Sequence, residues 1–246
     1  MKPLKSVCAA LLAAFSASAA AVGGLADVNV FDRTEGRQLP VYWHEGRAYV
    51  AGKPGNEYSV RVRSRQREDV LGVISVDGVN VITGETSATQ QSGYVLAPYR
   101  QFDISGWRKN LASTAAFYFT SLPDSYAART GRPDNVGVIG VALFRKKEEP
   151  APVARPAPAA RAEAQNAPRA ADRDDRLGTG HGRIEASQTR YVDFERASSE
   201  PAETVVIYYD SYRNLLARGI VPPQYQYPPR RPAPNPFPGF VADPPA

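Results

Sequence analysis

Residues 70–82 read VLGVISVDGVNVI, and this stretch decides the fold. Two runs rich in valine and isoleucine flank the dipeptide Asp77-Gly78. Asp-Gly between such runs is typical of a two-residue β-hairpin turn, because glycine accepts a positive φ at no steric cost. Over residues 70–76 both alternate faces are apolar or small, which predicts a strand that is covered on both sides. The sequence therefore predicts a β-hairpin inside a layered β-structure.

Short β-branched and aromatic runs continue on both sides of this hairpin, over residues 27–145. Turn residues separate the runs, and Glu45-Gly46 predicts a second hairpin. Short strands at regular spacing, without a long 3.6-residue periodicity, are typical of a sandwich or barrel. We predict an all-β fold, an antiparallel β-sandwich of jelly-roll-like type.

The chain beyond residue 145 divides into three parts. Residues 146–176 are rich in Ala, Pro, Arg and Glu, so they have little apolar surface to offset the entropy of ordering and are expected to form a disordered linker. Residues 177–220 contain strand-like runs at 190–194 and 204–209 and a short helical pattern at 211–218. These elements are too few for a core of their own, so we predict that they pack back onto the sandwich. Prolines and aromatic residues alternate over residues 221–246, which predicts an extended or disordered tail.

The N-terminus predicts export. Lys2 and Lys5 precede a short apolar run and a series of alanines and serines, which is the pattern of a cleavable signal peptide over residues 1–21. The apolar run is shorter than the roughly 20 residues that cross a bilayer. Cleavage removes the single cysteine, Cys8, and lowers the formal net charge from +5 to +3. We therefore expect a periplasmic or extracellular protein with no transmembrane segment, no thiol chemistry and too little positive charge to bind nucleic acid.

Four arginines alternate with other residues at the end of one predicted strand: Arg61, Arg63, Arg65 and Arg67. Side chains two residues apart share a face of a strand, so a continuous strand would line the four up at intervals of about 6.6 Å. Such a ladder could bind an acidic polysaccharide or the phosphates of lipopolysaccharide through bidentate contacts. The alternative is a solvated edge strand, whose charges prevent edge-to-edge aggregation.

Aromatic residues offer a second kind of candidate binding surface. Trp107 follows Gly106 in a predicted loop and is the best candidate for stacking on a sugar, with Tyr94 as a further candidate. The alternative is that Trp107 closes the hydrophobic core.

Evidence for catalysis or a metal centre is weak in this sequence. His44 and His181 are the two histidines, and neither lies in a metal-binding spacing or beside a nucleophile motif. The stretch GTGHG at residues 178–182 lacks the strand, helix and Lys-Ser or Lys-Thr of a phosphate-binding loop, and it is interpreted as a flexible turn. We expect no metal and no cofactor.

Four short stretches of the main domain carry a resemblance. They are SVDGVNV at residues 75–81, GWR at 106–108, SYAARTG at 125–131 and NVGVIGVA at 135–142. Together they resemble a group of uncharacterised exported bacterial proteins with a β-sandwich domain. The resemblance implies a bacterial envelope setting and carries no known activity or site.

We expect a non-catalytic interaction or structural protein of the envelope or the extracellular medium, with an envelope protein or an anionic polysaccharide as its partner. One alternative is a carbohydrate- or lipopolysaccharide-binding module that uses Trp107 and the arginine ladder. A second alternative is a hydrolase that uses His181 with an unidentified nucleophile.

Overall fold

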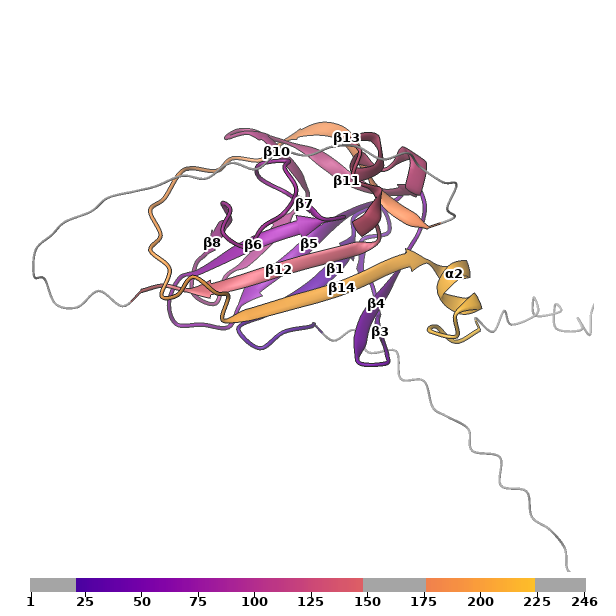
Figure 1. Cartoon of the computed structure of the whole chain (residues 1–246), viewed down its shortest axis with the longest axis horizontal. Helices are drawn as coiled ribbons and strands as arrows, with labels where there is room; N and C mark the ends of the chain where they lie inside the picture. The colour runs from indigo at the N-terminus through magenta and orange to yellow at the C-terminus, as the bar shows by residue number, and fades with distance from the viewer. Residues whose placement is uncertain (1–20, 148–175, 224–246) are drawn as a thin grey trace, which may run out of the picture.

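Two β-sheets packed face to face make up the protein in the computed structural model, which describes residues 21–147 and 176–223 (Figure 1). Sheet I consists, in spatial order, of β3 (Val41–His44), β4 (Arg47–Gly52), β14 (Glu203–Ser211), β12 (Val138–Arg145), β6 (Val70–Val76) and β7 (Val79–Asn80), with β8 (Tyr94–Leu96) also paired to β6. Sheet II consists of β10 (Gly106–Asn110), β11 (Ser113–Ser121), β5 (Glu57–Ser64), β1 (Ala26–Asp32) and β2 (Arg37–Gln38), with β13 (Leu177–Ala186) paired to β11 and β9 (Gln101–Ile104) paired to β5. The short helices are η1 (Leu122–Asp124), α1 (Tyr126–Arg129), η2 (Pro133–Asn135) and α2 (Tyr212–Ala217).

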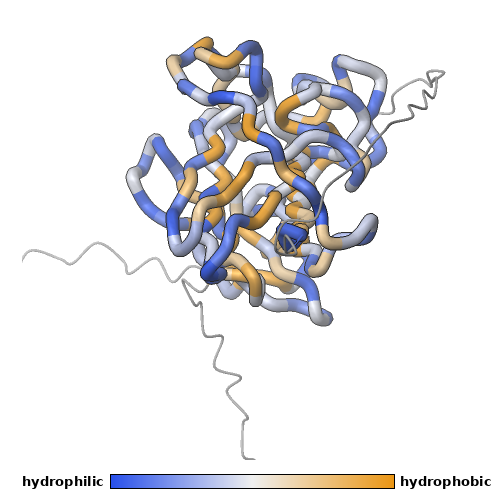
Figure 2. Tube along the Cα trace, turned by 90° about the vertical axis from the view of Figure 1, so that its left-hand side faces the viewer, coloured by the Kyte–Doolittle hydropathy of each residue, from blue (hydrophilic) through white to orange (hydrophobic). Residues whose placement is uncertain are grey.

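This architecture confirms the all-β sandwich, while the finer jelly-roll-like topology stays a prediction. Inward-facing side chains of both sheets form one core, with Val60 and Val62 from β5 and Ile74 and Val141 from sheet I all buried. Figure 2 shows that many hydrophobic segments run through the middle of the molecule, whereas hydrophilic segments are frequent at its periphery. The alternation of apolar and polar residues along a strand produces this division.

Both predicted hairpin turns are present. Glu45 and Gly46 have φ values of 49° and 73°, and Asp77 and Gly78 have values of 53° and 71°. Two central residues with positive φ define the type I′ turn, whose twist matches that of the strands it joins. The short-range turn signal was therefore sufficient to position β3 against β4 and β6 against β7.

The strands that the sequence predicts to be covered on both faces are β6 and β12, which pair in the middle of sheet I. On the outer face, Leu71, Val73 and Phe144 are buried in a small cluster that also contacts Phe194. The guanidinium carbon of Arg196 lies over the ring of Phe144, 4.2 Å from its centre. Residues from the C-terminal part of the chain thus cover this face, as predicted.

The C-terminal segment does more than dock on the sandwich, because it supplies one strand to each sheet. In sheet I, β14 lies between β12 and β4, antiparallel to the first and parallel to the second. Since β4 and β12 run in opposite directions, a strand inserted between them must be parallel to one of them. The predicted antiparallel sandwich thus contains one parallel pair among the described strands, β14 with β4. Both edges of the β14 backbone are hydrogen-bonded, so the segment is an integral part of the fold.

Two local predictions in this segment are wrong. Residues 178–182 are not a flexible turn but part of β13, where Gly180 leaves room for Tyr118: a Cβ on Gly180 would lie 2.1 Å from the tyrosine ring. Residues 190–194 alternate in polarity but form no strand. Residues 190–193 are exposed, Phe194 packs on the outer-face cluster described above, and none of the five pairs at a sheet edge.

The predicted signal peptide, linker and proline-rich tail lie almost entirely outside the described residues. Within residues 21–147 and 176–223, no helix has the length and apolar character needed to cross a bilayer.

Candidate functional site

Three loops meet at one end of sheet I. The β5–β6 loop holds residues 65–69, the turn before β9 contains Tyr99, and β12 ends at Arg145, directly opposite Val70 of β6. Two main-chain hydrogen bonds of 3.0 Å join these loops. The amide of Ser64 donates to the carbonyl of Arg100, and the amide of Ala197 donates to the carbonyl of Arg145. They enclose an open pocket of about 630 Å³, which is lined by Arg65, Gln66, Arg67, Glu68, Asp69, Val70, Tyr99, Arg145, Lys146, Lys147 and Ala197. We call it the basic pocket.

Five of the lining side chains are cationic, and they differ in how they are paired. Arg65 forms an ion pair with Asp27, and Lys147 forms one with Glu195. Arg145 donates a hydrogen bond to the amide oxygen of Gln66, which carries no charge.

The other two cations are Arg67 and Lys146, whose side chains form no ion pair or hydrogen bond with the residues that the structure describes. Arg67 is exposed and Lys146 is half-buried. Glu68 and Asp69 are also at the pocket, so it combines an excess of cations with two acidic groups at its wall. Two cations without partners leave hydrogen-bond donors available to an anion from solution.

Tyr99 contributes the aromatic ring of the pocket and has an unusual backbone. It is 54% exposed and has a φ of 56°. Residues 97–100 read APYR, and the amide of Arg100 donates to the carbonyl of Ala97 at 3.2 Å, as in a β-turn with Pro98 at its second position. A turn of this kind with positive φ at its third position favours Gly or Asn there. A tyrosine in this conformation costs about 1 kcal/mol or more.

The four predicted arginines do not form one ladder, because β5 ends at Ser64. Arg61 and Arg63 point away from the core, but Arg61 pairs with both carboxylate oxygens of Asp103 at 2.8 Å and lies over the ring of Phe31. Arg65 and Arg67 lie beyond the strand in the basic pocket. The alternative of an edge strand is also wrong, since β5 is flanked by β1 on one side and by β9 and β11 on the other.

Trp107 lies on strand β10 and not in a loop, so that prediction is wrong. It is 3% exposed, and its ring lies 4.7 Å from the rings of Phe117 and Tyr126. The preceding Gly106 is required by a close approach of strands, because a Cβ there would lie 2.0 Å from the carbonyl oxygen of Ala115. Trp107 therefore closes the core, which was the alternative interpretation.

The side chains of Tyr94 and His181 also contact other residues of the fold and are not free to form a separate site. The hydroxyl of Tyr94 accepts hydrogen bonds from Arg108, at 3.1 and 3.3 Å. The imidazole of His181 contacts the rings of Trp107 and Tyr126, and burial, reinforced by Lys109 and Arg129, lowers its pKa. Among the described residues, no group of three or more His, Cys, Asp or Glu side chains is arranged to hold a metal ion.

A buried acid, Asp77, lies at the opposite end of β6. The sequence indicated only its role in the hairpin turn with Gly78. Asp77 is fully buried, and its carboxylate accepts three hydrogen bonds. One oxygen accepts from the hydroxyl of Tyr209 at 2.5 Å and from the main-chain amide of Gly137 at 2.9 Å. The other oxygen accepts from the main-chain amide of Thr179 at 2.8 Å. The hydroxyl of Thr179 lies 2.6 Å from those of Tyr209 and Tyr58. Burial raises the pKa of Asp77 to about 6, although these donors oppose the shift. Asp77 thus connects the β6–β7 turn to both C-terminal strands.

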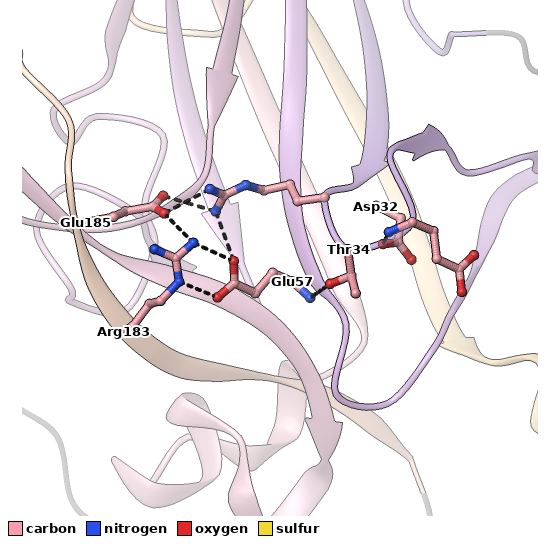
Figure 3. A network of polar contacts seen from close by, with 7 residues as sticks. Asp32, Thr34, Glu57, Arg183 and Glu185 are labelled. Carbon is pink, nitrogen blue, oxygen red and sulfur yellow. Dashed lines mark hydrogen bonds and ion pairs between the residues drawn. The ribbon is translucent and has the colours of Figure 1, made fainter.

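Sheet II carries a second charged cluster, in which every cation is paired. Figure 3 shows Arg183 of β13 between Glu57 and Glu185. Arg33 donates two hydrogen bonds to the carboxylate of Glu185, at 2.9 and 3.0 Å, and also lies 3.7 Å from Glu57. These alternating charges connect β13, β5 and the loop after β1, so they have a structural role.

Compared with models of protein families, with curated proteins and with solved structures, the chain matches none. The resemblance to exported bacterial proteins therefore stays a prediction, and function is inferred from the geometry of the site.

Proposed function

We propose that the protein is an exported, non-catalytic binding protein that holds an anionic ligand in the basic pocket. The observation that carries the proposal is the convergence of five cationic side chains on one open pocket, two of them without a partner among the described residues. The cations of the cluster in Figure 3 are less suited to this role, because Glu57 and Glu185 already neutralise their charge.

The construction of the pocket supports a binding role. Its loops follow the ends of β5 and β12 and precede β6, so a rigid sheet positions them, and loops held in this way commonly carry binding residues. A charge-assisted hydrogen bond to an anion stabilises a complex by about 1.5–3 kcal/mol. Binding should therefore depend strongly on the individual cations.

Export would bring this pocket to the bacterial envelope or the surrounding medium, where acidic polysaccharides and lipopolysaccharide phosphates are abundant anionic ligands. The predicted signal peptide and the resemblance of residues 75–81, 106–108, 125–131 and 135–142 support this location. The mature net charge of +3 is too small for a nucleic-acid partner, so we assign the ligand to the envelope polymers.

A panel of immobilised acidic and neutral polysaccharides tests the proposal. The protein should bind the acidic members, and the double variant Arg67→Ala with Lys146→Ala should bind them about 10-fold or more weakly, since each lost contact is a charge-assisted hydrogen bond. The matched control is Arg37→Ala with Lys53→Ala, which removes two exposed cations paired with Glu35. The control should bind as the wild type does. Equal binding to neutral and acidic polymers, or equal loss in both double variants, contradicts the proposal.

A further inference from the structure

Tyr99 combines three properties that packing alone does not explain. Its φ of 56° suits glycine or asparagine, its side chain is 54% exposed, and it lines the basic pocket. A residue kept in an unfavourable conformation, without burial to compensate, points to a function for its side chain.

The turn that carries Tyr99 is held on both sides. Pro98 fixes the φ of the preceding position, and the amide of Arg100 closes the turn onto the carbonyl of Ala97. The carbonyl of Arg100 in turn accepts from the amide of Ser64 at the end of β5. The aromatic ring is therefore presented from a defined backbone position beside the cations of the β5–β6 loop.

An exposed ring beside cations fits a ligand with two kinds of surface. The apolar face of a sugar ring packs on an aromatic side chain, while its charged substituent accepts hydrogen bonds from Arg67 and Lys146. A polyphosphate or an acidic peptide needs the cations but offers no such face. The volume of about 630 Å³ lies within the range of about 300–1,000 Å³ that is typical of small-ligand sites.

We infer that the basic pocket binds a sugar residue that carries an anionic group, with the ring stacked on Tyr99 and the anion held by Arg67 and Lys146. The inference rests on the proposed function, and it goes beyond it by naming the chemical class of the ligand. The anionic group can be a carboxylate, as in a uronic acid, or a phosphate ester.

Calorimetric titration with small probes tests this inference. The probes are a trimer of galacturonic acid, glucose 6-phosphate, inorganic tripolyphosphate, tetraglutamate and the neutral sugar maltotriose. The wild type should bind one or both acidic sugars more tightly than tripolyphosphate or tetraglutamate, and the stronger of the two identifies the anionic group. Maltotriose should bind at least 10-fold more weakly than the acidic sugars, because it offers no charge-assisted bond.

Variants of Tyr99 separate stacking from charge. Tyr99→Gly should weaken binding of the acidic sugar about 5-fold or more and leave the affinity for tripolyphosphate unchanged, because only the stacked ring is lost. Tyr99→Phe should retain wild-type affinity for both. Glycine adopts the positive φ without strain, so the variant should keep the fold of the turn, and its unfolding curve checks this.

Two results overturn the inference, and they are distinguishable. If tripolyphosphate or tetraglutamate binds at least as tightly as the acidic sugars and Tyr99→Gly changes nothing, the ligand is a simple anion, and the proposed function stands without the sugar. If no anionic probe binds, the proposed function fails as well.

Discussion

The two ends of strands β6 and β12 differ in how their polar groups are satisfied. At one end, Asp77 is buried and both of its carboxylate oxygens accept hydrogen bonds from Tyr209, Thr179 and Gly137. At the other end, about 20 Å along the strands, the basic pocket is open and two of its cations have no partner among the described residues. The comparison suggests that the buried end holds the C-terminal strands in place, while the open end is available for a ligand.

The difference follows from the cost of burying a polar group. A buried carboxylate without partners destabilises a fold strongly. The stability of the buried end therefore depends on each hydrogen bond that Asp77 accepts. Exposed cations cost little when they lack partners, because water solvates them. Changes at the buried end should therefore affect stability, and changes at the open end should affect binding.

The largest effect is expected for Asp77→Ala. The substitution leaves the hydroxyl of Tyr209 and the amides of Thr179 and Gly137 without their acceptor, and it should lower the free energy of unfolding by about 3 kcal/mol or more. Urea denaturation followed by circular dichroism measures the change. A loss below about 1 kcal/mol would show that the network is not what holds the C-terminal strands.

The pH dependence of stability should reveal the same group. The pKa of Asp77 is about 6 in the folded protein, compared with the ordinary value of 3.8 that applies to the unfolded chain. The folded state therefore binds the proton more tightly than the unfolded state does. The unfolding free energy should therefore fall as the pH rises from about 4 to about 6, by roughly 2–3 kcal/mol, and then level off.

Glu35 contributes to the pH dependence with the opposite sign and at lower pH. Lys53 and Arg37 lower its pKa from 4.5 to about 2, so the stability that it provides is lost only as the pH falls below about 4.5. The measured quantity is thus the difference between wild type and Asp77→Asn at each pH. A difference that does not change between pH 4 and pH 7 contradicts the assignment.

At the open end, salt should weaken ligand binding. Raising the ionic strength from about 0.05 M to 0.5 M screens exposed charges, and affinity for an acidic oligosaccharide should fall about 10-fold. The variant Arg67→Ala with Lys146→Ala should show a smaller dependence on salt, because it has fewer charges to screen. Equal salt dependence in both proteins would place the binding charges elsewhere.

The smallest effect is a gain in stability. Tyr99→Gly should raise the free energy of unfolding by up to about 1 kcal/mol, since glycine adopts the φ of 56° without strain and its greater freedom in the unfolded chain offsets part of the gain. Thermal or urea denaturation measures this change. A loss of more than about 1 kcal/mol would mean that the tyrosine ring contributes to packing, and that it is not reserved for a ligand.

The fold could be predicted largely because its signals are local. Asp77-Gly78 and Glu45-Gly46 each specify a turn from two adjacent residues, and the doubly apolar runs of β6 and β12 indicate strands that are covered on both faces. The insertion of β14 beside β4 was not predicted, since the pairing of residues far apart in the chain leaves no mark in either strand alone.

The basic pocket could be predicted only in part. Arg65 and Arg67 stood out through their spacing, but Lys146 and Lys147 belonged by composition to the predicted linker. Their position follows from the register that sets Arg145 opposite Val70, and the sequence does not encode this register locally. Trp107 misled for a related reason: Gly106 indicated a loop, whereas its actual role is to allow a close approach to Ala115.

An NMR titration with an acidic oligosaccharide tests the central claim most directly. Amide shifts should change at the open end, at Arg67, Tyr99 and Lys146, and remain unchanged at the buried end, at Gly137 and Thr179. Shifts confined to another surface, or the absence of any shift at millimolar ligand, would contradict the assignment of the basic pocket as the binding site.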